Sequence, residues 1–172
     1  MNSTKIIRCD RDDIETICKI INDGARKYAG VIPEDCWHDP YMSMDDLKAE
    51  IDAGVQFWGL QRSGRLAGVM GIQDKGPVTL IRHAYVLQHH HRKGIGARLL
   101  RHLESLTEKP ILIGTWQAAR WAVSFYGKHG YWKLNRAQTI QALETYWSIS
   151  PRQVETSVVM TNSRWPGGLI PI

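Results

Sequence analysis

Two glycines, Gly94 and Gly96, follow an apolar segment and open a stretch with helical periodicity. Free N–H groups at a helix start and the helix dipole favour a bound anion, and glycine lets the anion approach the main chain closely. Arg92, Lys93 and Arg98 add positive charge around the same turn. The arrangement predicts a site for a phosphorylated ligand.

The spacing of these glycines excludes two common nucleotide motifs. A P-loop requires G-x-x-x-x-G-K-[ST], and the chain contains no such run. A dinucleotide-binding turn requires a third small residue, but Leu99 occupies that position, and such a turn usually follows the first strand of its fold. The turn therefore indicates another phosphate-binding fold.

The flanking segments have the patterns of a strand and a helix. Leu80–Leu87 is an apolar strand, and Gln88–Lys93 is a short polar loop. Beyond the loop, apolar residues recur at intervals of four, four and three, which predicts one buried helical face: Ile95, Leu99, Leu103 and Leu106.

The segment Tyr85-Val86-Leu87, with R-K-G-I-G-A-x-L-L after it, resembles the acetyl-CoA signature of the GNAT N-acetyltransferase superfamily. That signature reads Q/R-x-x-G-x-G/A, directly after a strand and at the start of a helix. Both glycines match, and His91 stands at the Q/R position.

A second motif is similar to the late helix of the same superfamily, A-x-x-F-Y-x-x-x-G-F followed by a strand. Ala119 stands where that family often has Asn, and Tyr replaces the final Phe. The matching residues are Ala122, Phe125, Tyr126, Gly130 and Tyr131.

The resemblance implies a mixed α/β (α+β) fold of the GNAT-like acyl-CoA N-acyltransferase type. Its central, mostly antiparallel sheet would be splayed between the fourth and fifth strands, with helices on both faces. The chain has no repeats or linkers, so we expect one domain over residues 1–172. Other strands are expected at Lys5–Cys9, Val55–Gln61, Arg65–Gln73, Ile111–Trp116, Tyr131–Leu134 and Val154–Met160. Other helices are expected from Asp10 or Asp12 to Tyr28, from Ser43 to Gly54, at Ala118–Lys128 and at Ala137–Trp147.

The family resemblance also implies acetyl-CoA as the acyl donor. Its pantetheine arm would pair with the main chain of Tyr85, Val86 and Leu87, and the N–H of Val86 would bind the thioester oxygen. The other expected cofactor contacts are His91, Arg92, Lys93, Gly94, Ile95, Gly96, Ala97 and Ala119.

Two side chains are candidates for proton transfer. Tyr126 matches the superfamily's usual general acid, which protonates the CoA sulfur; the alternative is a core aromatic residue. His83 is a candidate base because histidine titrates near neutral pH. Strand alternation would point Arg82 and His83 to opposite faces, although the family often carries a bulge here. A water molecule, Glu34 or Asp35, or no dedicated base are the alternatives.

The acceptor would be a primary amine of a small molecule, attacked directly in a ternary complex. The segment 30–42 loosely resembles the substrate lid of phosphinothricin-type acetyltransferases, and the expected acceptor contacts are Tyr28, Glu34, Trp37, Tyr41 and Trp116. A peptide or protein amine, or a non-catalytic CoA sensor, remain alternatives.

Bulk composition sets the remaining expectations. The net charge of +5 is a modest surplus, which we interpret as a match to a phosphorylated cofactor rather than to nucleic acid. Three cysteines without a secretion signal indicate reduced thiols and a cytoplasmic protein. No apolar run has membrane-spanning length. His89-His90-His91 lacks spaced partners, so no metal is expected. Homodimer formation is left open.

Overall fold

The structure is a computed structural model that describes residues 3–167, and it has a mixed α/β architecture with seven strands. The strand order is β1-β2-β3-β4-β5-β7-β6. The described residues form two compact units, one of 3–27, 38–74 and 81–107, and the other of 28–37, 75–80 and 108–167. The predicted mixed α/β fold is confirmed, whereas the splay between the fourth and fifth strands stays a prediction.

The first unit contains the strands and helices on both sides of the glycine turn. Its strands β1, β2 and β3 are antiparallel, with Ile6 opposite Leu60 and Trp58 opposite Met70. The elements are β1 (Thr4–Arg8), η1 (Arg11–Asp13), α1 (Ile14–Ala25), α2 (Met44–Asp52), β2 (Gln56–Arg62), β3 (Arg65–Asp74), β4 (Thr79–Val86), η4 (Gln88–His90) and α3 (Ile95–Glu104).

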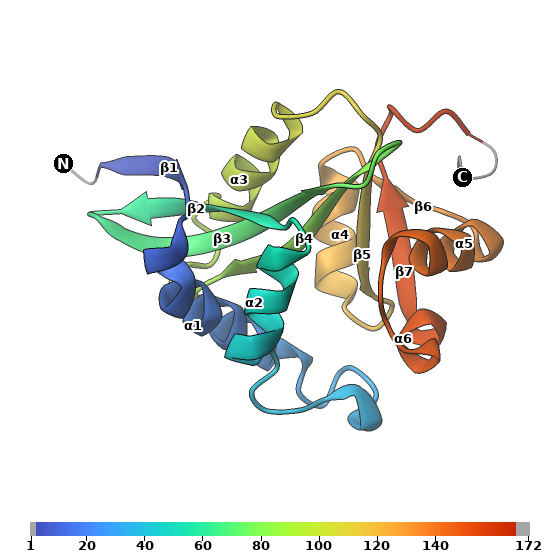
Figure 1. Ribbon diagram of the computed structural model, residues 1–172, viewed down its shortest axis with the longest axis horizontal. Helices are drawn as coiled ribbons and strands as arrows, with labels where there is room; N and C mark the ends of the chain where they lie inside the picture. The colour runs from blue at the N-terminus through green and yellow to red at the C-terminus, as the bar shows by residue number, and fades with distance from the viewer. Residues whose placement is uncertain (1–2, 168–172) are drawn as a thin grey trace. The chain divides into compact units, whose positions relative to one another are not determined.

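Helices cover both faces of these strands (Figure 1). On one face α1 and α2 bury their apolar stripes against Phe57 and Val69. On the other face α3 lies over β3, where a Cβ on Gly68 would approach Ile95 to 2.8 Å. Each buried Ile or Leu of these stripes contributes roughly 1.5–3 kcal/mol of apolar transfer free energy.

Side-chain caps start α2 and the turn before α1, as the sequence predicts. Asp10 accepts a hydrogen bond from the N–H of Asp12 in a capping box, and Ser43 accepts from Asp46. The helix predicted from Asp10 to Tyr28 is divided into η1, α1 and a short η2 (Arg26–Tyr28).

The second unit packs α5 against β5 and β7. Leu112, Leu143 and Val159 are among its fully buried residues. The first two residues of β4 also belong to this unit, where the N–H of Thr79 donates to the carbonyl of Pro110 at 2.9 Å. Its elements are η3 (Glu34–Cys36), β5 (Ile111–Trp116), α4 (Arg120–Lys128), β6 (Trp132–Lys133), α5 (Arg136–Tyr146), α6 (Pro151–Thr156) and β7 (Ser157–Thr161).

Two sequence predictions about these elements are wrong. The strand expected from Val154 begins only at Ser157, because Ser150 caps a helix whose first residue is Pro151. Leu106 is 46% exposed rather than buried, because α3 ends at Glu104 before the periodic pattern does.

None of the helices within residues 3–167 combines the length and the apolar character that a membrane span requires.

Candidate functional site

The glycine turn joins β4 to α3 in a geometry suited to an anion. Gly94 is the N-cap residue of α3 and has a φ of +71°, a conformation that glycine adopts without strain. No described side chain caps α3, in contrast to α2, α5 and α6. The first N–H groups of α3, on Ile95, Gly96 and Ala97, therefore have no acceptor within the helix or from a cap.

The end of β4 orients the main-chain groups that the sequence assigns to the cofactor. The N–H of Leu87 donates to the carbonyl of Ala67 on β3 at 3.0 Å. Because successive N–H groups of an extended strand point to opposite sides, the N–H of Val86 points away from β3. Leu87 is thus engaged within the sheet, while Val86 has the orientation expected of an oxyanion donor.

His91 holds the loop against the strand. Its Nε2 lies 2.8 Å from the carbonyl oxygen of Val86, which can only accept, so Nε2–H donates. The side chain at the Q/R position of the signature therefore stabilises the loop through a hydrogen bond to the end of β4.

The side chain of Tyr85 is half-buried and packs against the core of the first unit. A Cβ on Gly24 of α1 would lie 2.8 Å from a ring carbon of Tyr85, so the helix backbone packs directly on this ring.

The basic residues of the turn have different surroundings. Lys93 donates to the carbonyl of His89 at 3.2 Å, and Arg98 donates to the hydroxyl of Thr4 at 2.9 Å. Arg92 is exposed and has a φ of +61°. Arg98 therefore connects α3 to β1, whereas Arg92 and Lys93 place their positive charge directly before the glycine turn.

A basic hollow of about 420 Å³ adjoins the same loop. It contains two arginines, a lysine and two histidines but no acidic residue, and its lining is Arg62, Ser63, Arg65, Leu66, Leu87, His89, His90 and Lys93. The two arginines flank the β2–β3 hairpin turn, and their spacing around Ser63-Gly64 is the sequence signal that could have located the hollow.

A second polar cluster surrounds His83 on β4. His83 has a φ of +53°, and this left-handed residue interrupts the alternation of the strand. Nε2 of His83 and Nη1 of Arg82 both lie 2.8 Å from Oε2 of Glu50 on α2. Arg82 and His83 therefore contact the same carboxylate, and the interrupted strand is the alternative to simple alternation that the sequence left open.

Gln73 completes this cluster from β3. It is 4% exposed, its Oε1 accepts from Arg82 at 3.2 Å, and its Nε2 donates to the carbonyl of Ala53 at the end of α2 at 2.9 Å. Glu50 and Gln73 were not predicted, because no local pattern connects them to His83.

The cluster shifts the pKa values of its members in defined directions. Burial lowers the pKa of His83, and the charge of Arg82 lowers it further, while the hydrogen bond and charge of Glu50 oppose the shift. Burial alone raises the pKa of Glu50, but His83 and Arg82 outweigh it and the net pKa is lowered. At neutral pH His83 is therefore neutral and Glu50 is ionised.

Tyr126 lies on α4 in the second unit and is 6% exposed. Phe125 and Tyr131 pack edge-on against its ring, at centroid distances of 5.1 and 6.0 Å. Burial and the nearby Tyr28 raise the pKa of Tyr126 well above its usual range. Its phenol therefore stays protonated at neutral pH.

The residues expected to contact the acceptor are divided between the two units. Tyr28 stacks on Trp121 at 5.9 Å, and Glu34 and Trp37 belong to the same unit. Tyr41 belongs to the other unit, where it stacks on His38 at 5.9 Å.

The other two predicted residues of the second unit lie beside each other. Trp116 is 6% exposed, and its carbonyl accepts the N–H of Ala119 at 3.0 Å. The carbonyl of Ala119 accepts from Ala122 and Val123, so its main chain is already engaged in starting α4.

Within residues 3–167, no three His, Cys, Asp or Glu side chains are grouped to hold a metal ion. The three cysteines are free thiols, and burial followed by the charges of Asp13 and Asp10 raises the pKa of Cys9 to about 12.

The family model for the acetyltransferase (GNAT) domain matches residues 21–143. The match runs through segments of both units and includes the glycine turn, the His83 cluster and Tyr126. The chain therefore belongs to the GNAT acetyltransferase family. No curated protein sequence gives a significant match.

Solved structures share this fold at low sequence identity. An acetyltransferase of the GNAT family from Staphylococcus aureus Mu50 has a TM-score of 0.70 at 15% identity, with 95% of this chain and 100% of that chain covered. The PaiA N-acetyltransferase of Thermoplasma acidophilum, in complex with coenzyme A, has a TM-score of 0.69 at 18% identity, covering 93% and 98%. The ribosomal-protein-S18-alanine N-acetyltransferase of Escherichia coli has a TM-score of 0.66 at 15% identity, covering 96% and 97%.

Proposed function

We propose that this protein is an N-acetyltransferase that moves the acetyl group of acetyl-CoA to a primary amine of a small molecule. The observation that carries the proposal is the uncapped start of α3, directly behind β4, in a chain of the GNAT acetyltransferase family. The pyrophosphate of acetyl-CoA binds the N–H groups of Gly94, Ile95, Gly96 and Ala97, and Arg92 and Lys93 add positive charge. The fold neighbour with coenzyme A bound supports the choice of cofactor.

The reaction proceeds by direct attack, and each proton has a defined destination. The ammonium group gives one proton to His83, and the freed lone pair forms the C–N bond with the thioester carbon. The N–H of Val86 stabilises the oxyanion. As the C–S bond breaks, sulfur keeps the electron pair and takes the proton of Tyr126. Nitrogen then loses a second proton, which restores the phenol, and the proton on His83 leaves to solvent.

Features of the second unit support an amine as acceptor. Tyr28 and the partly exposed Trp121 present stacked rings that can attract a cation. Glu34 and Asp35 lie side by side on η3. Arg152 hydrogen-bonds the carboxylate of Asp35 at 3.0 Å, which lowers the pKa of Asp35 and offsets its negative charge. The neighbouring Glu34 is exposed.

The test is release of free thiol from acetyl-CoA in the presence of amines, amino acids, polyamines and peptides. We expect release with one class of small amines. Release only with peptides would indicate that the acceptor is a peptide or protein amine. Tight binding of acetyl-CoA without release of thiol would favour a non-catalytic CoA sensor.

A further inference from the structure

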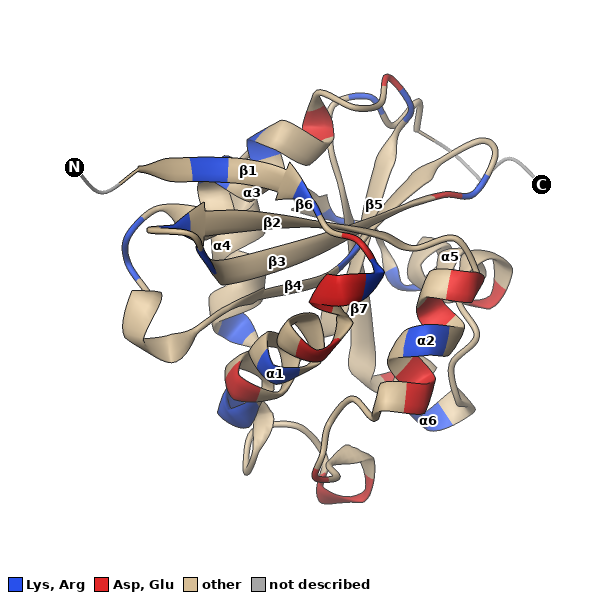
Figure 2. Ribbon diagram, turned by 60° about the vertical axis from the view of Figure 1, so that its left-hand side comes forward, with Lys and Arg blue, Asp and Glu red and all other residues tan. Residues whose placement is uncertain are grey.

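The contact between α2 and β4 gives His83 a fixed orientation. Glu50 is one of several acidic residues of α2, which also include Asp45, Asp46 and Asp52 (Figure 2). Glu50 alone among them has a contact to His83, at 2.8 Å from Nε2, and its side chain is only 27% exposed. Phe57 of β2 stacks on the imidazole at a centroid distance of 5.9 Å and an interplanar angle of 29°. The ring is therefore held at one nitrogen and on one face.

The charges around His83 decide which nitrogen carries the proton. The titratable groups that act on it are Glu50 from α2 and Arg82 from its own strand, while Phe57 contributes an uncharged ring. An ionised carboxylate only accepts hydrogen bonds, so Nε2 must carry the hydrogen. In a neutral imidazole the other nitrogen, Nδ1, then has a free lone pair.

The carboxylate is itself anchored from the opposite side. Arg82 bonds Oε2 of Glu50 and Oε1 of Gln73, and Gln73 in turn holds the carbonyl of Ala53 at the end of α2. The C-terminal part of α2 is thus connected to β4 through Glu50 and to β3 through Ala53. This network opposes any rotation of Glu50 away from His83.

We propose that Glu50 is a positioning residue that keeps the hydrogen of His83 on Nε2 and so makes Nδ1 the atom that accepts the proton of the substrate ammonium. This inference rests on the proposed function and deepens it. In the step, the N–H bond of the ammonium breaks and an Nδ1–H bond forms. Glu50 then stabilises the resulting imidazolium through the same 2.8 Å hydrogen bond.

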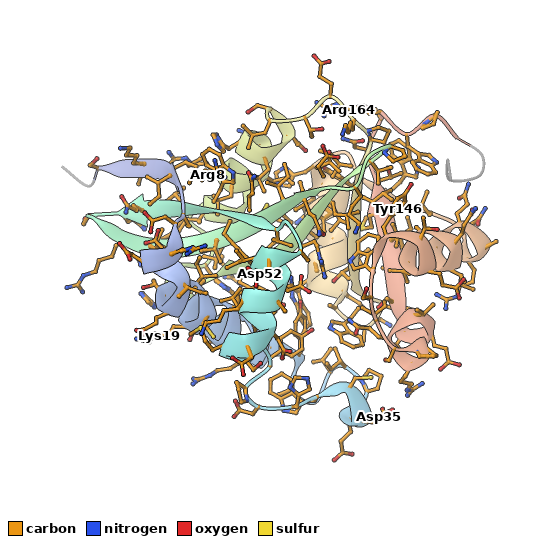
Figure 3. The ribbon with its side chains drawn as sticks, viewed as in Figure 1. Arg8, Lys19, Asp35, Asp52, Tyr146 and Arg164 are labelled. Carbon is orange, nitrogen blue, oxygen red and sulfur yellow. The ribbon has the colours of Figure 1, made fainter. Side chains whose placement is uncertain are left out.

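The first measurement is the ¹⁵N NMR spectrum of the His83 ring at neutral pH in the wild-type chain and in Glu50→Gln. We expect the Nε2–H tautomer in the wild type and a mixture of tautomers in the variant. Asp52→Asn is the matched control, because Asp52 is an exposed carboxylate on the same helix (Figure 3). An Nδ1–H tautomer or an imidazolium in the wild type would overturn the proposal, and the wild-type measurement does not depend on the folding of any variant.

The second measurement is the pH profile of kcat/KM. Glu50→Gln should lower kcat about 10- to 100-fold, by analogy with the loss of a carboxylate that orients a metal-bound histidine. Because Glu50 raises the pKa of His83, its removal should also move the acidic limb of the profile to lower pH. A purely structural role would leave that limb in place, and an unmoved limb would overturn the inference.

Different results would refute the proposed function and the positioning role of Glu50. A protein that transfers no acetyl group to any amine would overturn the proposed function, while the tautomer of His83 would still show whether Glu50 fixes the ring. An active protein whose Glu50→Gln variant keeps the wild-type rate and profile would overturn the positioning role alone.

Discussion

The substitution Tyr126→Phe tests whether Tyr126 acts as a catalytic acid or only as a core aromatic residue. The ring is 6% exposed and keeps its edge-on contacts to Phe125 and Tyr131 when only the hydroxyl is removed. A single side-chain hydrogen bond contributes only about 0.5–1.5 kcal/mol to stability, which sets the scale for removing one hydroxyl. Loss of a general acid lowers kcat about 10²- to 10⁴-fold, which corresponds to about 2.7–5.5 kcal/mol in the activation barrier. The expected catalytic effect therefore exceeds the expected structural one.

The assay is steady-state thiol release, with acetyl-CoA affinity measured by calorimetry and stability by thermal unfolding. The matched control is Tyr146→Phe, since Tyr146 lies on α5 in the same unit (Figure 3). It is 7% exposed, and burial raises its pKa as well. We expect an unchanged kcat for the control and unchanged cofactor affinity for both variants. A kcat for Tyr126→Phe equal to that of the control would refute the role of the phenol.

Two further predictions concern the turn and the His83 cluster. Gly96→Glu should weaken acetyl-CoA binding at least about 100-fold, because it places bulk and negative charge where the helix start favours an anion. The control Arg101→Glu, in the last turn of α3, should bind acetyl-CoA with normal affinity. Equal affinity of the two variants would contradict the role of the glycine turn in binding phosphate. The free energy of unfolding should decrease as the pH is lowered below 6.5, the ordinary pKa of histidine. The reason is that His83 in the unfolded chain takes up a proton that the folded His83, with its lowered pKa, does not bind. The slope is up to about 1.4 kcal/mol per pH unit, to be measured by urea unfolding between about pH 8 and pH 5. The same slope in His83→Gln would show that another group is responsible.

The position of His91 explains how the turn accommodates a departure from the family signature. The signature has Gln or Arg there, and the histidine instead bonds back to Val86 at 2.8 Å. Its side chain therefore holds the loop, and the main-chain N–H groups of α3 carry the expected contact with phosphate. Main-chain contacts of this kind depend on the glycines and on the helix start more than on the side chain at position 91.

The sequence alone determined the strand, turn and helix around Gly94. Periodicity and turn chemistry are local properties, so residues a few positions apart carry the whole signal. Ile95, Leu99 and Leu103 are buried as their spacing predicts, Ser43 caps α2, and Ile111–Trp116 forms β5. The family resemblance arose from the same local features and is confirmed by the family match.

The tertiary structure decided the surroundings of His83. Glu50 is 33 positions from His83 in the chain, and the two meet only because α2 packs beside β4. The positive φ of His83 also turns its side chain to the same carboxylate as that of Arg82, which strand alternation cannot anticipate. Helix packing and one left-handed residue thus create a charged cluster that short-range patterns do not encode.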